Sequence, residues 1–186
     1  ARYIFGVIRE IMKRGGQVKG FDTAFSGDVP LGAGLSSSAA LESTYAFALN
    51  DMFKLGIDKF DLAKIGQATE HNYIGVKCGI MDQFASVFGK EGHLIRRSLE
   101  YEYVPFNPKG YKVVLIDSVV KHELASSAYN KRRESCETVV KAIQKRHPEV
   151  ELLRDADMAM LAEVKGEVTA EDYMRAEYVI EEIQRL

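Results

Sequence analysis

The chain has 186 residues, of which 46% are hydrophobic and 28% charged, and its formal net charge is −2. This length suits one large domain or two small ones, and the nearly balanced charge gives no basic field for nucleic acid or an anionic membrane surface. The two cysteines, Cys78 and Cys136, form no CxxC motif or disulfide framework, and no apolar run approaches the roughly 20 residues that cross a bilayer, so we expect a cytoplasmic protein.

The first part of the chain predicts three helices and one strand. Apolar residues recur at helical spacing over residues 1–14. The alternation of Phe21, Thr23 and Phe25 then predicts a half-buried strand that ends at Pro30. After a loop rich in glycine and serine, residues 37–53 and 58–73 predict two further helices.

The middle of the chain predicts strands. The segment 80–88 is interpreted as a short helix followed by a strand, and a glycine-containing turn then leads into the segment HLIRR. Tyr101 and Tyr103 alternate with glutamates, which is typical of a strand, and YKVVLIDS (111–118) predicts a buried strand.

The end of the chain predicts helices again, over residues 127–146 until Pro148, over 157–164, and after Thr169. Thr169 with Asp172 three residues later is typical of a helix-capping box. Strands in the middle and helices at the end indicate an α+β fold, with a domain boundary near residue 125.

The stretch VPLGAGLSSSAALE (29–42) has two interpretations. Glycines let backbone N–H groups approach a phosphate closely, and the N-terminus of the following helix favours an anion at the same place. Hydroxyls of Ser36, Ser37 and Ser38 could donate to phosphate oxygens or bind Mg²⁺. The stretch matches neither GxxxxGK[ST] nor GxGxxG, and the alternative is a glycine turn with one serine as the helix N-cap. The local chemistry leaves both interpretations open.

Several segments resemble the GHMP small-molecule kinases, in the form found in the galactokinase family. They are PLGAGLSSSAALE (30–42), CGIMDQFAS (78–86), KHELASSAYNKRRESCE (121–137) and RAEYVIEE (175–182). The resemblance implies the α+β two-domain architecture of that superfamily, with a ribosomal protein S5 domain 2-like N-terminal part. Residues 1–125 would form an incomplete nucleotide-binding domain, and residues 126–186 the beginning of the C-terminal domain.

The resemblance also implies a phosphotransferase that uses ATP and Mg²⁺ to phosphorylate the anomeric 1-hydroxyl of α-D-galactose. Asp82 would accept the proton of the sugar hydroxyl, and a loose phosphoryl-transfer transition state tolerates such a weak base. The implied nucleotide-binding residues are Gly32, Ala33, Gly34, Leu35, Ser36, Ser37, Ser38 and Tyr3. The implied sugar-binding residues are Gly79, Asp82 and Tyr129, and the implied Mg²⁺ ligands are Ser38 and Glu70.

Each implied role has a structural alternative: Glu70 as a solvated helix residue, Asp82 as a helix cap, and Tyr129 as a half-buried aromatic residue. The histidines are scattered without metal-binding spacing. Alternative functions are another GHMP sugar kinase, or a non-catalytic paralogue that senses galactose and ATP. A soluble α+β domain with a purely structural glycine loop is the remaining alternative.

The family's other motifs would lie upstream of Ala1 and downstream of Leu186. The residues present therefore could not complete an active site, and we expect the chain to be inactive by itself. We expect a monomer whose partners are galactose and ATP, with neither nucleic acid nor membrane.

Overall fold

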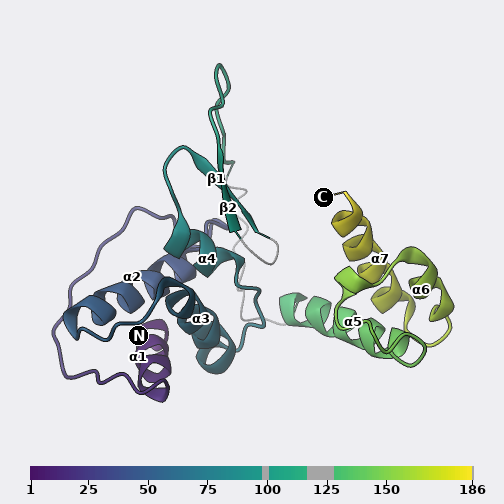
Figure 1. Ribbon diagram of the computed structural model, residues 1–186, viewed down its shortest axis with the longest axis horizontal. Helices are drawn as coiled ribbons and strands as arrows, with labels where there is room; N and C mark the ends of the chain where they lie inside the picture. Colours follow the sequence, from purple (N-terminus) through teal and green to yellow (C-terminus); the bar gives the residue numbers. More distant parts are fainter. Residues whose placement is uncertain (98–100, 117–127, 186) are drawn as a thin grey trace. The chain divides into compact units, whose positions relative to one another are not determined.

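The computed structural model describes residues 1–97, 101–116 and 128–185, and the chain divides into two compact units, Ala1–Glu123 and Leu124–Leu186 (Figure 1). Each unit has its own buried apolar core. The predicted boundary near residue 125 lies outside the described residues and stays a prediction. Helices and a small antiparallel sheet make up the described structure, in agreement with the predicted α+β class.

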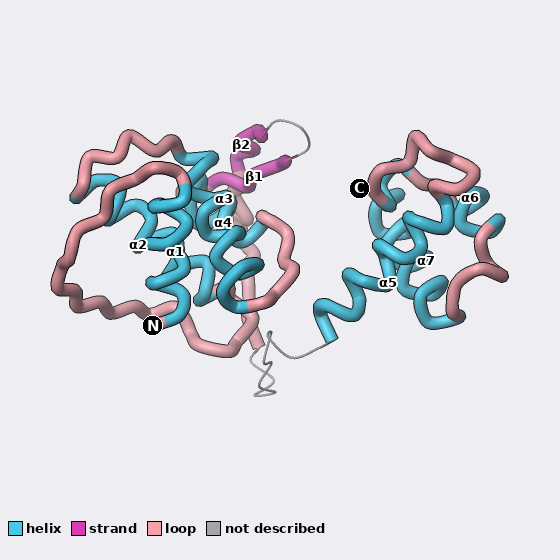
Figure 2. The backbone as a smooth tube through the Cα atoms, turned by 90° about the horizontal axis from the view of Figure 1, so that it is seen from below, coloured by secondary structure: helices cyan, strands magenta, loops and turns pink. Residues whose placement is uncertain are grey.

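The helices of the first unit include the three that were predicted in its first part. They are α1 (Arg2–Lys13), α2 (Ser37–Met52), α3 (Lys59–Thr69), a π-helical turn η1 (Glu70–Ile74) and α4 (Met81–Phe88). The first three helices pack against one another (Figure 2). The core of this part consists of Val7, Ile11, Tyr45, Ala46, Leu49, Leu62 and Ile65. Asp58 starts α3, because its side chain accepts a hydrogen bond from the backbone N–H of Asp61.

The strand predicted around Tyr101 and Tyr103 is confirmed. Strands β1 (His93–Arg97) and β2 (Tyr101–Pro105) pair antiparallel, with Leu94 opposite Val104. Tyr101 packs its ring 5.4 Å from Phe84 and 4.9 Å from Phe88 on α4, and these two phenylalanines stack at 4.2 Å. The hairpin therefore packs against α4 through aromatic side chains.

The strand predicted to end at Pro30 does not form, so this prediction is wrong. Thr23 Oγ1 lies 2.9 Å from the Tyr45 hydroxyl, and the Phe25 ring contacts the Tyr45 ring edge-on at 5.7 Å. The Phe21 ring in turn meets Phe53 at 6.3 Å. The alternating side chains thus contact Tyr45 and Phe53, although Thr23 and Phe25 remain exposed. A strand also needs a partner, and in the described part of the chain only β1 and β2 pair.

Two further strand predictions fail. Residues 80–88 contain α4 and no strand, because helical packing continues to Phe88. Residues 111–116 of the predicted buried strand have no regular structure and are exposed, with Val113 75% and Ile116 88% exposed. Residues 117 and 118 lie outside the described residues.

The second unit contains α5 (Ala128–Ile143), a short 3-10 turn η2 (Leu153–Asp155), α6 (Met158–Glu163) and α7 (Ala170–Gln184). Its core is Val139, Val140, Ala142, Ile143, Val150, Leu153, Leu161, Val164, Ala176 and Ile180. The predicted cap of the last helix is confirmed, because Thr169 Oγ1 accepts from the Asp172 N–H at 3.1 Å and donates to its carboxylate at 2.8 Å. Among the described residues, none of the helices has the length and apolar character needed to cross a bilayer.

Candidate functional site

The loop before α2 has an alternating left-handed backbone. Gly32 and Gly34 have φ of 74° and 73°, and Ser36, the N-cap residue of α2, has φ 53°. Ser36 makes no capping hydrogen bond with its side chain, so the single-serine-cap interpretation lacks its defining contact. Backbone that alternates into the left-handed region turns successive N–H groups toward a common concavity and favours an anion, as does the N-terminus of a helix.

Three predicted site residues come together beside this loop. Ser38 in the first turn of α2 hydrogen-bonds the carboxylate of Glu70, and Asp82 in the first turn of α4 acts on Glu70 through its charge. Glu70 is only 4% exposed. Burial, and then the charge of Asp82, raise the pKa of Glu70, while the Ser38 hydrogen bond and His71 oppose the rise. Glu70 is therefore not the solvated helix residue that was its structural alternative.

The π-helical turn places Glu70 at the end of α3. Its carbonyl accepts hydrogen bonds from the N–H groups of Gly75 at 2.8 Å and Val76 at 3.0 Å, and Gly75 with φ 86° ends the turn. Turns of this kind are rare and occur often at functional sites. The spacing of apolar residues predicted one continuous helix over 58–73 and gave no signal of the π turn.

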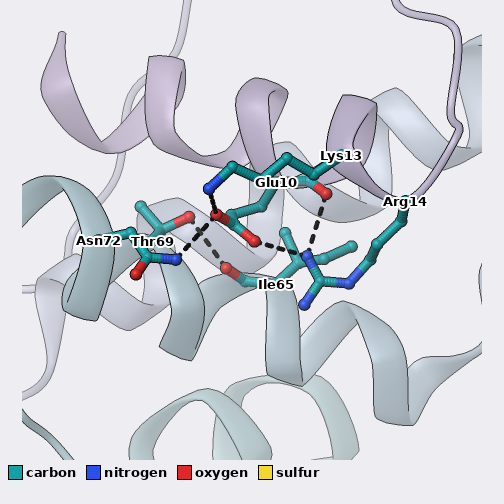
Figure 3. A network of polar contacts seen from close by, with 6 residues as sticks. All are labelled: Glu10, Lys13, Arg14, Ile65, Thr69 and Asn72. Atoms are coloured by element: carbon teal, nitrogen blue, oxygen red, sulfur yellow. Dashed lines mark hydrogen bonds and ion pairs between the residues drawn. The ribbon is translucent and has the colours of Figure 1, made fainter.

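A buried carboxylate ties this turn to α1 (Figure 3). Glu10 is 3% exposed and accepts hydrogen bonds from Lys13 at 2.8 Å, Arg14 at 2.7 Å and Asn72 at 3.0 Å. Burial alone would raise the pKa of Glu10, but the hydrogen bonds from Lys13, Asn72 and Arg14 outweigh it and hold the pKa below its ordinary value. Asn72 lies in the π turn two residues after Glu70, so this network anchors the turn to α1.

A second buried carboxylate, that of Glu42 on α2, was not predicted as a site residue. Glu42 is 0% exposed and accepts a hydrogen bond from Gln83 Nε2 at 3.3 Å. Burial, and then the charge of Glu70, raise the pKa of Glu42 to about 8, against the opposing hydrogen bond from Gln83. The sequence carries no local signal for this residue, because glutamate is common in exposed helices and its burial depends on α3 and α4.

The other predicted residues have different surroundings. Tyr3 on α1 lies near the same carboxylates, since burial and the charges of Glu70 and Glu42 raise the pKa of its hydroxyl. Gly79 faces open space, because a Cβ there would meet no atom within 4 Å. Tyr129 is 43% exposed on α5 in the second unit, which is described separately.

Cys78 does not have the character of a nucleophile. Burial and the nearby carboxylates raise the pKa of its thiol to about 11. Its carbonyl lies 2.8 Å from His71 Nε2 and accepts a hydrogen bond from Gln67 Nε2 at 3.3 Å. The contacts of this loop residue are therefore structural.

The donors at the site suit a hard cation. Ser38 and Glu70 present hydroxyl and carboxylate oxygens, the ligand types that Mg²⁺ prefers, and Mg²⁺ usually takes its remaining ligands from phosphates and water. Within residues 1–97, 101–116 and 128–185, no cluster of three or more His, Cys, Asp or Glu side chains could by itself hold a metal ion.

Comparison with known proteins gives a consistent result. Residues 2–90 match the family model described as "GHMP kinases N terminal domain". The galactokinase of Thermotoga petrophila is 44% identical over 187 residues, which cover 99% of this chain and 51% of that protein. The galactokinase of Thermosipho africanus is 49% identical over 148 residues, covering 78% of this chain and 42% of that protein.

A solved structure agrees with these sequences. The crystal structure of Lactococcus lactis galactokinase complexed with galactose matches with a TM-score of 0.81 and 30% identity, over 98% of this chain and 48% of that one. Residues 2–90 thus match the N-terminal domain of the GHMP kinases. The relatives named here are galactokinases, and the chain spans about half of their length.

Proposed function

We propose that the complete protein containing this chain is a galactokinase, which transfers the γ-phosphate of ATP to the anomeric 1-hydroxyl of α-D-galactose. The proposal rests above all on one observation: Ser38, Glu70 and Asp82 converge beside the N-terminus of α2. A site of this kind needs anion-binding amides, oxygen ligands for a cation and a carboxylate base. The loop at residues 32–38, Ser38 with Glu70, and Asp82 would supply these three elements from separate parts of the first unit.

The residues of the candidate site would have the following roles. The amides of residues 32–38 would bind the phosphates, and Tyr3 would lie beside the nucleotide. Ser38 and Glu70 would hold Mg²⁺, which neutralises charge on the transferring phosphate when it is bound. Gly79 and Tyr129 would contact the sugar.

Asp82 would accept the proton of the sugar hydroxyl. A carboxylate is a weak base for an alcohol, but the hydroxyl need not ionise early in a loose transition state, so positioning supplies much of the rate. Asp82 is half-buried and acts through its charge on the buried carboxyl of Glu70.

The remaining assignments are parts of the same proposal. Residues 1–125 would belong to the nucleotide-binding domain, and residues 126–186 would begin the C-terminal domain. The complete protein would act as a monomer in the cytoplasm.

The proposal is tested by the change Asp82→Asn in the complete protein that the gene encodes. We expect galactose-dependent ADP formation by the wild type and a loss of about 10²–10⁴-fold in kcat in the variant. Asp61→Asn is the matched control, because Asp61 is a half-exposed aspartate on α3 whose carboxylate pairs with Lys64. Wild-type protein that binds galactose and ATP without turnover, or an Asp82→Asn variant with normal kcat, would contradict the proposal.

A further inference from the structure

We propose that Glu42 and Gln83 form a positioning pair, whose buried hydrogen bond fixes α4, and with it Asp82, against the first turns of α2. The inference rests on the proposed function, because the role of Asp82 belongs to that function. It assigns to the reaction two residues that need not touch either substrate.

The contact between the two side chains is buried and crosses helices. Gln83 Nε2 on α4 donates to Glu42 Oε2 on α2 at 3.3 Å, and the two residues are 2% and 0% exposed. Gly66 on α3 makes room for them, since a Cβ there would lie 2.8 Å from Gln83 Cγ and 3.4 Å from Glu42 Oε2. Helices α2, α3 and α4 therefore meet at this pair.

The place of the pair in the sequence links it to the site. Gln83 follows Asp82 directly in the first turn of α4. Glu42 lies four residues after Ser38, so both are on one face of α2. Ser38 hydrogen-bonds Glu70, and one turn further along the same face Glu42 accepts from Gln83. Helix α2 thus holds the π turn through one polar contact and α4 through the other.

The pair is poorly suited to a purely stabilising role. Glu42 Oε1 and Gln83 Oε1 are buried and have no hydrogen-bond partner among the described residues. An unsatisfied buried polar atom is destabilising, whereas two apolar side chains of similar shape can replace a buried pair at little cost in stability. What an apolar pair lacks is direction, because a hydrogen bond constrains how α4 can rotate and shift against α2. Small shifts of a catalytic group, of about 1 Å, can reduce a rate by about 10²-fold.

The test compares variants of the complete protein under saturating ATP and galactose. Glu42→Met and Gln83→Met each remove one partner, and the double variant replaces the pair by apolar side chains of similar length. Glu42→Gln keeps an acceptor for the Gln83 amide. Asn50→Leu is the matched control, because Asn50 makes two 2.9 Å hydrogen bonds to the backbone of Ile57 at the far end of α2. For each variant, kcat, both KM values and the melting temperature are measured.

We expect both single methionine variants to lower kcat, and Gln83→Met to lower the melting temperature as well. The double variant should recover the melting temperature to within a few degrees, while its kcat stays at least about tenfold low and both KM values change less than about threefold. Glu42→Gln should retain most of the wild-type kcat, and Asn50→Leu should lower the melting temperature alone.

Three results would overturn the inference: a double variant with wild-type kcat, a Glu42→Gln variant as slow as Glu42→Met, or a kcat that merely follows the melting temperature through all variants, Asn50→Leu included. A different result separates this inference from the proposed function. If the wild type itself does not phosphorylate galactose, the proposed function fails whatever the variants do. If the wild type is active, the variants test the pair alone.

Discussion

Replacing Glu42 by glutamine should stabilise the protein near neutral pH. The carboxyl of Glu42 is 0% exposed and its pKa is raised from 4.5 to about 8, with burial as the main cause and the charge of Glu70 as the next. At pH 7 the unfolded chain has released this proton and the folded chain still holds it. That difference of about 2.5 pH units corresponds to roughly 3 kcal/mol in favour of the unfolded state.

The sign follows from the raised pKa. Stability that is present below the unfolded pKa, near 4.5, is lost progressively as the pH rises toward 8. Glutamine has no proton to release, and like the protonated acid it still offers an acceptor oxygen to Gln83. We therefore expect Glu42→Gln to be about as stable as the wild type near pH 4.5 and more stable by roughly 3 kcal/mol at pH 7. In a protein about twice as long as this chain, as the relatives are, that corresponds to roughly 3–6 °C in melting temperature.

The assay is thermal unfolding of the complete protein between pH 4.5 and 8, without ATP or Mg²⁺, for the wild type, Glu42→Gln and a control. Glu91→Gln is a suitable control, because Glu91 is exposed in the turn before β1. The reasoning is refuted if the difference in melting temperature between Glu42→Gln and the wild type does not grow with pH. It is also refuted if Glu91→Gln shows the same growth.

Three other substitutions test the packing and the caps. Glu10→Gln should lower the free energy of unfolding by about 1–2 kcal/mol at pH 7. Because the pKa of Glu10 is lowered, this loss should shrink as the pH falls below 4.5, which urea titrations at several pH values would check. Gly66→Ala should lower the free energy of unfolding by about 1–3 kcal/mol, since the new Cβ would lie 2.8 Å from Gln83 Cγ. Gly27→Ala is its control and should change the melting temperature little, because a Cβ at Gly27 meets nothing within 4 Å. Thr169→Ala should weaken the second unit by about 1 kcal/mol through loss of the α7 cap, visible in its unfolding by circular dichroism.

The helices could be predicted from the sequence because their signals are local. The pattern over residues 1–14 became α1 (Arg2–Lys13), and Thr169 begins α7 as its capping box predicted. Strands depend on a partner that the segment itself does not specify. The alternation around Thr23 marked side chains that contact Tyr45, and yet that backbone forms no ladder with any described strand.

Residues of the candidate site could be selected from the sequence only where a motif carries them. Ser38, Glu70 and Asp82 were selected by resemblance, and the structure places them near one another. Asn72 and Glu42 were missed, because a buried polar side chain is recognised by what surrounds it and not by its own segment. Periodicity gave no warning of the π turn either, because one extra residue in a helical turn hardly disturbs the apolar pattern.

Glu42, where α2, α3 and α4 meet, lowers the stability of the folded protein at pH 7, while its hydrogen bond to Gln83 constrains the position of α4. A cost of roughly 3 kcal/mol at pH 7 is a large share of the 5–15 kcal/mol by which domains are typically stable. Residues that break the local rules of burial without a gain in packing are typical of functional sites, where activity and stability compete. The two effects can be separated in one position, since Glu42→Gln removes the titration and keeps the hydrogen bond to Gln83, whereas Glu42→Met removes both. If the hydrogen bond serves only stability, kcat must follow the melting temperature in the same way for Glu42→Gln and Glu42→Met. If the hydrogen bond positions Asp82, the kcat of Glu42→Met alone falls below the value that its melting temperature predicts.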